Sequence, residues 1–137
     1  YRYFSSNAIP DHKYGSFPNN HNPNKVSSQN LEYRVTLSPE FSSEGNTSLK
    51  LRPHGIFLNG VPLDSWAAEC YNVPNGQCHD MNHPWCENPI SDYIDLGEDN
   101  HNAHVQPNGT YHYHGDPNAI YSSNPSSESL PEIVGWA

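Results

Sequence analysis

Positively charged side chains are scarce in this chain. It has 6 Lys and Arg residues against 15 Asp and Glu, which gives a formal net charge of −9 at pH 7. Proteins that bind DNA or RNA neutralise a run of phosphates with basic side chains. We therefore predict no nucleic-acid partner, and the acidic balance favours small cations instead.

Long hydrophobic runs are also missing. No apolar stretch approaches the roughly 18 residues that a membrane-spanning helix requires. We therefore predict no membrane span. The chain begins at Tyr1 and not at Met, which indicates a removed leader or a fragment of a longer protein.

Proline and aromatic residues, by contrast, are abundant. The 13 Pro and 9 Gly residues interrupt regular structure, so helices and strands must be short. The 12% aromatic content supplies bulky side chains for a core, which disordered chains lack. A length of 137 residues suits one domain. We predict a single, mostly β, loop-rich domain of the β-sandwich or barrel-like kind.

The first part of the chain differs from the rest. Residues 1–30 are predicted to form an extended arm, because prolines recur there and its aromatic side chains require burial on the domain or on a neighbour. The domain is predicted to span 31–137. Apolar and polar residues alternate over 31–37, which predicts a strand. Shorter strands are expected at 49–51 and 55–58, joined in a β-meander. A helical turn is expected at 65–69, and at most a short helix at 90–96.

Cysteines and glycosylation sequons indicate an oxidising, extracellular setting. Cys70, Cys78 and Cys86 lie in a loop rich in Pro, Asn and Gly, which favours a disulfide over a metal knuckle. The third cysteine bonds to another chain, bonds to a cysteine beyond this sequence, or stays a buried thiol. Asn46 and Asn108 each begin an acceptor sequon, so glycans are expected there. We predict an extracellular or cell-surface location.

A histidine cluster is predicted on a hairpin near the carboxyl end. Side chains alternate along a strand, so His112 and His114 share one face while Tyr111 and Tyr113 share the other. Two imidazoles on one face of a strand can bind the same metal ion. A further histidine, His104, precedes the turn of this hairpin.

The turn decides whether His104 joins the other two histidines. A two-residue turn at 108–109 would pair His104 with Tyr113, on the wrong face. A three-residue loop at 107–109 pairs it with His112 instead. We favour the longer loop, because Gly109 suits its left-handed position and Pro107 has no N–H to donate to a strand partner. His104, His112 and His114 are then the predicted metal ligands.

Neutral imidazoles favour a transition metal. Three of them with an open position suit copper or zinc, whereas the oxygens of Asp95, Glu98 and Asp99 would suit calcium. Asp64 and Glu69 are weaker carboxylate candidates. In the competing interpretation, alternating Tyr and His are an ordinary strand pattern, and the histidines bond to protein groups.

Several blocks of the chain, in this order, resemble the bacterial YHYH domain family. They are GVPL at 60–63, AAE at 67–69, LG at 96–97, NAHVQP at 102–107 and GTYHYHG at 109–115. The arm motif NAIPDH at 7–12 is similar to that family's amino-terminal signature. The resemblance implies a predominantly β domain of secreted or envelope-associated proteins, with no established activity. By motif position it adds Asp11 and His12 as candidate ligands.

Two features depart from the family pattern. The segment 70–86 looks like an insertion, and the chain stops at Ala137, where family members continue into an Asp-Gly-Phe-Pro segment. A β domain without its final strands would leave an open edge, which favours completion by a strand of another chain.

Three functional hypotheses follow from these observations. The first is an extracellular, non-catalytic metal-binding module built on the histidine cluster. The alternative is a structural subunit of a self-assembling surface polymer or filament, which associates with itself by exchanging the arm or a strand. The third is a metal-dependent enzyme, in which an open position on the metal activates water or oxygen.

Overall fold

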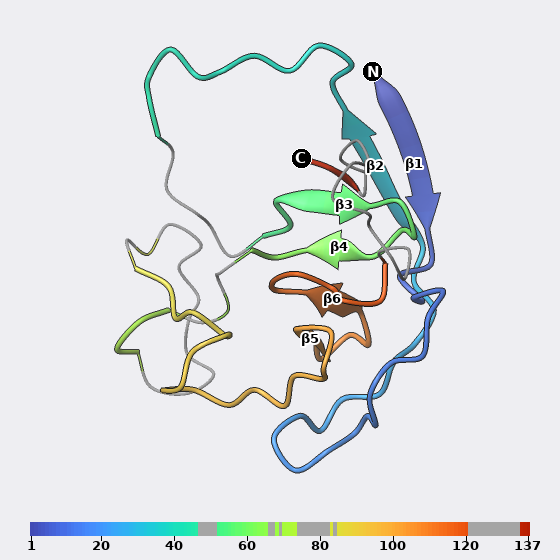
Figure 1. Cartoon of the computed structure of the whole chain (residues 1–137), viewed down its shortest axis with the longest axis vertical. Helices are drawn as coiled ribbons and strands as arrows, with labels where there is room; N and C mark the ends of the chain where they lie inside the picture. Colours follow the sequence, from blue (N-terminus) through green and yellow to red (C-terminus); the bar gives the residue numbers. More distant parts are fainter. Residues whose placement is uncertain (47–51, 66–67, 69, 74–82, 84, 121–134) are drawn as a thin grey trace, which may run out of the picture.

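The computed structural model describes residues 1–46, 52–65, 68, 70–73, 83, 85–120 and 135–137. Within these ranges there are strands but no helix. The strands are β1 (Arg2–Ser6), β2 (Leu31–Val35), β3 (Gly55–Phe57), β4 (Pro62–Leu63), β5 (Ala103–Val105), β6 (Tyr111–Tyr113) and β7 (Gly135–Trp136). They form a two-stranded sheet, β1-β2, and a five-stranded sheet in the order β5-β6-β4-β3-β7 (Figure 1). The mostly β prediction is confirmed, and the described sheets do not close into a barrel.

Strand β6 lies inside the larger sheet, between β5 and β4. It pairs antiparallel with β5 and parallel with β4, where Leu63 is opposite Tyr113. All of β6 is buried, because the sheet covers both of its edges and other side chains cover both of its faces. The Tyr-His-Tyr sequence therefore sits in the interior of the fold.

The turn between β5 and β6 is the three-residue loop at 107–109 that the sequence predicted, flanked by Gln106 and Thr110. The N–H of Gln106 donates to the Thr110 carbonyl at 3.0 Å, and the N–H of Gly109 donates to the Gln106 carbonyl at 2.8 Å. Gly109 has a φ of 89°, a conformation that glycine adopts at little cost. This loop places His104 directly opposite His112.

Aromatic side chains make up much of the core. The buried cluster consists of Phe57, Val61, Ala103, Val105, Tyr111 and Tyr113. Partly buried side chains of the arm, Phe17 and Val26, pack against it. The odd-numbered residues of β6 thus point into the hydrophobic core, which leaves the opposite face of that strand for its histidine.

The arm runs along its own domain. Strand β1 pairs with β2, and the Arg2 guanidinium lies 4.1 Å from the centre of the Trp136 ring. Farther along, the N–H of Ser27 donates to the Gly109 carbonyl at 2.9 Å. Figure 1 shows the arm descending from β1 past the edge of the larger sheet toward β5. The boundary at residue 30 stays a prediction.

Some local predictions were wrong or lie outside the described residues. The predicted β-meander does not form, because β2 pairs with β1 of the arm and belongs to a different sheet from β3. The strand at 31–37 ends at Val35. Residues 90–93 form turns and bends, residues 94–96 have no regular structure, and the segment contains no helix. The strand expected at 49–51 and most of the turn expected at 65–69 fall outside the described ranges.

The cysteine loop is described only in part. Cys70 and Cys86 face each other as an isolated antiparallel bridge, supported by a 2.9 Å hydrogen bond from the Tyr71 N–H to the Trp85 carbonyl. Cys78 lies outside the described residues. The pairing of the three cysteines therefore stays a prediction.

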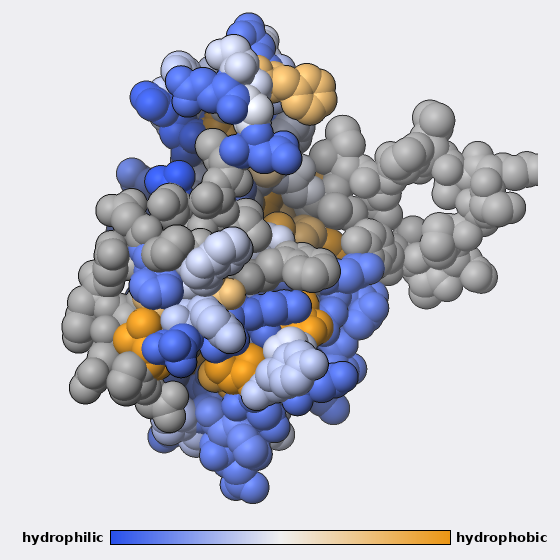
Figure 2. Space-filling view, turned by 90° about the vertical axis from the view of Figure 1, so that its left-hand side faces the viewer, coloured by the Kyte–Doolittle hydropathy of each residue, from blue (hydrophilic) through white to orange (hydrophobic). Residues whose placement is uncertain are grey.

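The face of the molecule seen in Figure 2 is mainly polar. Figure 2 shows a mostly hydrophilic face, on which hydrophobic side chains form small patches separated by polar ones. Asn46 and Asn108 are both exposed, and glycosylation at these positions stays a prediction. In the part of the chain that the structure describes, no helix is long and apolar enough to cross a membrane.

Candidate metal centre

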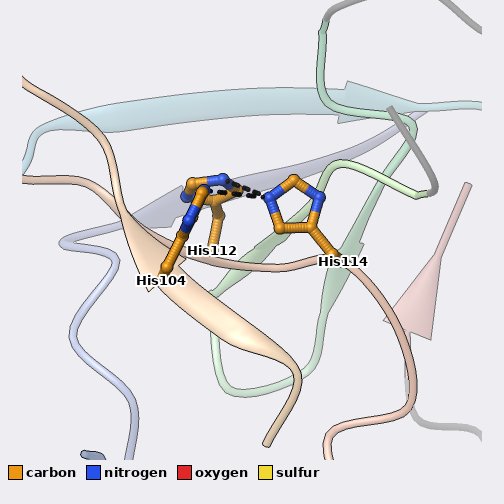
Figure 3. Close-up of side chains that lie close together, drawn as sticks. All are labelled: His104, His112 and His114. Carbon is orange, nitrogen blue, oxygen red and sulfur yellow. Dashed lines mark hydrogen bonds between the residues drawn. The ribbon is translucent and has the colours of Figure 1, made fainter. Parts of the chain in front are cut away.

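Three histidines meet where β5 and β6 pair. His104 comes from β5, His112 from the middle of β6, and His114 from the residue after β6. Their rings lie close together, with centroids 4.6 to 4.7 Å apart, and the planes are strongly inclined to one another. Figure 3 shows the imidazoles converging on a common point. We call these three residues the histidine triad.

Each imidazole of the triad is held by a backbone carbonyl. The Nδ1 atoms of His104, His112 and His114 lie 3.0 Å from the Leu96 carbonyl, 3.2 Å from the Thr110 carbonyl and 2.7 Å from the Asp64 carbonyl, respectively. A carbonyl oxygen can only accept, so each Nδ1 must carry the proton and donate it. In a neutral imidazole the other nitrogen, Nε2, is then an acceptor. The backbone thus selects the same tautomer at all three positions.

The three acceptor nitrogens point at one another. His114 Nε2 lies 2.9 Å from His112 Nε2 and 3.1 Å from His104 Nε2. These distances are as short as hydrogen bonds, but no hydrogen lies between the nitrogens. Their lone pairs therefore face one another, which is unfavourable unless a cation lies between them. A proton could bridge one of these contacts only if an imidazole became charged.

Burial opposes such a charge. Desolvation lowers the pKa of His114 to about 4, with a further contribution from neighbouring His104. The pKa of His112 is lowered well below its ordinary value, first by burial and then by the two other histidines. Burial also lowers the pKa of His104. All three imidazoles are therefore neutral near pH 7, as metal ligands must be.

The spacing of the triad fits a metal ion. Its three ligand atoms all lie within 4.8 Å of one another. With metal–nitrogen bonds of about 2.0–2.1 Å, the nitrogens of a tetrahedral four-coordinate site lie roughly 3.3 Å apart. The separations of 2.9 and 3.1 Å from His114 Nε2 are close to this value. The protein also supplies the outer hydrogen bonds that normally orient metal-binding histidines.

An acidic side chain stands beside the triad. Asp64 Oδ2 lies 3.9 Å from His112 Nε2 and accepts a hydrogen bond of 3.1 Å from the Gln106 side chain. The other oxygen, Oδ1, is buried and has no hydrogen-bond partner among the described residues. Desolvation raises the pKa of Asp64 to about 6, although the hydrogen bond from Gln106 acts in the opposite direction. Among the described residues, no Lys or Arg side chain forms an ion pair with this carboxylate.

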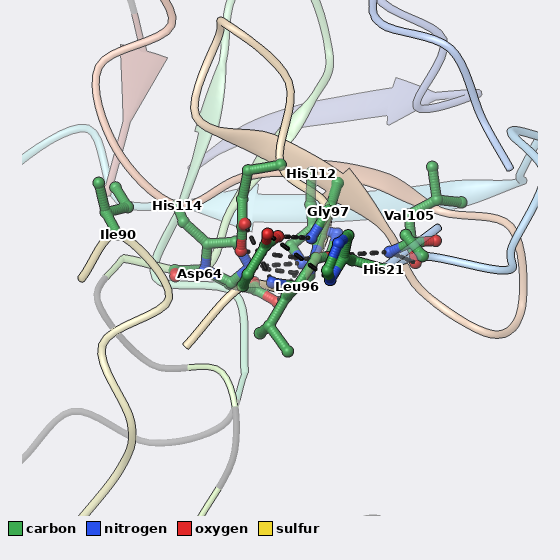
Figure 4. A network of polar contacts seen from close by, with 12 residues as sticks. His21, Asp64, Ile90, Leu96, Gly97, Val105, His112 and His114 are labelled. Carbon is green, nitrogen blue, oxygen red and sulfur yellow. Dashed lines mark hydrogen bonds and ion pairs between the residues drawn. The ribbon is translucent and has the colours of Figure 1, made fainter. Parts of the chain in front are cut away.

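A cavity of about 330 Å³ leads to the triad. The arm forms one wall of it with Asn22 and Asn24, whose side-chain amides donate to the Val105 carbonyl at 3.0 and 2.8 Å. The Asn22 amide also donates to the Leu96 carbonyl at 3.3 Å, and Leu96 is the residue that holds His104. Figure 4 shows these polar contacts running from the triad and Asp64 through Leu96 to Val105.

His12 and Asp11 do not join the triad. The Oη of Tyr113 donates to His12 Nε2 at 2.5 Å, since His12 Nδ1 is occupied by the Lys13 carbonyl. Asp11 Oδ1 accepts from the Asn59 amide at 3.3 Å, and that amide also donates to Tyr113. Because Tyr113 and His112 point to opposite faces of β6, both arm residues lie across the strand from the triad.

The acidic residues considered for calcium are used elsewhere. Asp99 Oδ2 accepts from the Tyr111 hydroxyl at 2.8 Å and from the Gly15 N–H at 2.9 Å. Asp95 Oδ1 accepts from the Gly97 N–H at 2.9 Å. Glu98 Oε1 lies 3.8 Å from Nδ1 of His104, on the side of that ring facing away from the triad. These carboxylates do not converge on one point.

The sequence identified the three histidines, but it indicated little about the groups around them. Asp64 was only a weak candidate, although it follows β4 and so lies beside the predicted hairpin. The Leu96 carbonyl and the Asn22 amide were missed. Both belong to segments without a regular hydrophobic pattern, and the family resemblance marked the LG block at 96–97 without indicating its role.

Comparison with known families agrees with the motif pattern. A family model described as "YHYH protein" matches residues 32–137, which is more than half of the chain. The matched range includes the hairpin, the triad and Asp64, and it starts after the arm motif at 7–12. No curated protein and no solved structure matches the chain. The chain therefore belongs to the YHYH protein family.

Proposed function

We propose that this protein is an extracellular metal-binding β module, in which His104, His112 and His114 hold one transition-metal ion. One observation carries the proposal: three buried Nε2 acceptors converge, while each Nδ1 donates to a backbone carbonyl. No proton lies between the Nε2 atoms to stabilise their close contacts. A bound cation would satisfy all three lone pairs at once.

Copper or zinc suits this site better than calcium. Imidazole nitrogen is a typical ligand of zinc and copper, whereas calcium takes six to eight oxygen ligands. The triad supplies nitrogen alone, and the described acidic side chains at 95–99 are engaged in separate hydrogen bonds. The role that we propose is binding and stabilisation rather than catalysis.

An extracellular location fits the same chain. The cysteine loop and the two sequons favour an oxidising compartment. Self-association through the arm stays a prediction, since β1 pairs here with β2 of its own chain. A catalytic role stays a prediction as well.

Metal titration of the purified protein tests the proposal. We expect one equivalent of Zn²⁺ or of copper to bind to the wild type, measured by calorimetry and by elemental analysis after dialysis. His114→Gln should abolish stoichiometric binding, because it removes the central nitrogen of the triad. His83→Gln is the matched control, since His83 contacts the Trp85 carbonyl in the cysteine loop. Equal binding by the wild type and His114→Gln would disprove the proposal.

A further inference from the structure

The backbone of Asp64 is fixed to the strand that carries the triad. Its N–H donates to the Tyr113 carbonyl at 2.9 Å, and its carbonyl accepts the Nδ1 proton of His114 at 2.7 Å. The N–H of Asp64 is thus bonded to the residue before His114, and its carbonyl is bonded to the His114 ring. The side chain therefore leaves the backbone at a defined position next to the triad.

The carboxylate of Asp64 approaches the side of the triad that faces the metal position. Its Oδ2 lies 3.9 Å from Nε2 of His112, and Nε2 is the nitrogen with the free lone pair. Oδ1 is buried without a hydrogen-bond partner among the described residues. Among the described residues, no Lys or Arg forms an ion pair with the Asp64 carboxylate. A buried carboxylate with an unsatisfied oxygen is costly, so this position calls for a cation.

Glu98 provides a contrast within the same site. Its Oε1 is likewise buried without a hydrogen-bond partner among the described residues, but it lies 3.8 Å from Nδ1 of His104, which already donates to the Leu96 carbonyl. Glu98 therefore stands behind the ring, where it cannot reach an ion held by Nε2. Of these two carboxylates, Asp64 is on the correct side.

We propose that Asp64 is the fourth ligand of the metal centre, and that the centre consequently takes a divalent ion in preference to Cu⁺. The inference rests on the proposed function of the triad. Neighbouring ligand atoms of a four-coordinate ion lie roughly 3.3 Å apart, and Oδ2 lies 3.9 Å from His112 Nε2, so the Asp64 side chain would turn toward the triad when an ion binds. Carboxylate oxygen is a hard, anionic ligand that favours Zn²⁺ or Cu²⁺ over the soft Cu⁺ ion.

This ligand set has a consequence for function. Three imidazoles and one carboxylate complete a four-coordinate shell and leave no open position for a substrate. The amide of Gln106 would stay beside the carboxylate and orient it, as groups around a metal centre commonly do. The cavity beside the arm would then serve as the path by which the ion enters.

The test compares two metals in two variants of the full chain. Asp64→Asn keeps the shape of the side chain but removes its charge, so its affinity for Zn²⁺ should fall by at least about tenfold. Its affinity for Cu⁺, held by the imidazoles, should stay within about twofold of the wild type. Asp92→Asn, at an exposed position, is the control and should bind both ions as the wild type does. An equal loss of affinity for both ions, or no loss of affinity for Zn²⁺, overturns the inference.

A second measurement needs no variant. The wild type loaded with Co²⁺ should give the intense visible bands of a four-coordinate ion, and added azide should leave these bands unchanged. A spectral change with azide would reveal an open position and overturn the inference. Wild-type protein that binds neither zinc nor copper would refute the proposed function itself, whereas normal binding by Asp64→Asn would refute only the role of Asp64.

Discussion

His114 Nε2 and His112 Nε2 lie 2.9 Å apart, although neither nitrogen carries a proton when the imidazoles are neutral. The backbone causes this arrangement, because it fixes the proton of each ring on the far nitrogen. The metal-free protein therefore holds an unfavourable contact within a fully buried part of its fold. Stability should accordingly depend on metal, on pH and on the outer groups that hold the rings.

Metal binding should stabilise the fold. A ligand that binds the folded state alone contributes about 2.7 kcal/mol to the free energy of unfolding at a concentration of 100 Kd. We expect Zn²⁺ to raise the Tm of the wild type and a chelator to reverse the change. His114→Gln should show no zinc-dependent rise, while His83→Gln should behave as the wild type. Thermal unfolding with and without metal measures this, and a zinc-dependent rise in His114→Gln would contradict it.

Acid should destabilise the metal-free protein. Burial lowers the pKa of His114 to about 4 from 6.5 and also lowers those of His104 and His112. The unfolded chain therefore binds more protons at these residues between pH 6.5 and 4, and the free energy of unfolding falls as the pH drops through that range.

Asp64 acts in the opposite direction. Burial raises its pKa from 3.8 to about 6, so between these values the folded state binds the extra proton. Asp64→Asn should remove this contribution and make the acid-induced loss of stability steeper than in the wild type. Urea unfolding at several pH values, in the presence of a chelator, measures the two slopes. A shallower dependence of the free energy of unfolding on pH in Asp64→Asn would show that Asp64 does not oppose the effect of the histidines.

The turn at Gly109 should be sensitive to a single methyl group. Gly109 has a φ of 89°, and an added Cβ would clash with Ser27 of the arm. Gly109→Ala should therefore cost more than the ~1 kcal/mol expected from the backbone conformation alone. Gly45→Ala is the matched control, since Gly45 has a φ of 82° and open space where its Cβ would lie. Equal destabilisation of the two variants, measured by urea unfolding, would contradict the clash.

Asn22 should affect metal binding from the outer shell. Its amide bonds to the carbonyls of Val105 and Leu96, and the latter carbonyl holds His104. Asn22→Ala should weaken Zn²⁺ binding by about 10–100-fold, the range typical of outer-shell partners. Asn24→Ala removes a bond to the same Val105 carbonyl without a contact to Leu96, so it should lower stability but not affinity. Equal losses of Zn²⁺ affinity in Asn22→Ala and Asn24→Ala, measured by calorimetry, would argue against an effect of Asn22 through Leu96 and His104.

Tyr113 should contribute to stability and not to the metal centre. Its hydroxyl donates to His12 and accepts from Asn59 on the face of β6 opposite the triad. Tyr113→Phe leaves these partners unsatisfied and should cost about 1–3 kcal/mol in the free energy of unfolding. Its Zn²⁺ affinity should match that of the wild type. A large change in affinity would mean that the two faces of the strand are coupled.

Much of the hairpin could be predicted from the sequence alone. Alternation placed His112 and His114 on one face, and the chemistry of Pro107 and Gly109 selected the loop that puts His104 opposite His112. These features depend on residues close together in the chain, where backbone geometry leaves few options. The mostly β fold followed from proline content and short alternating segments for the same reason.

The surroundings of the triad were decided by tertiary structure. Asp64 reaches the site because β4 pairs in parallel with β6, a pairing that joins residues 50 positions apart. Asn22 reaches it because the arm folds back against β5. His12 had the right chemistry but packs against Tyr113, on the other face. Long-range pairing and packing set these positions, and local alternation carries no information about them.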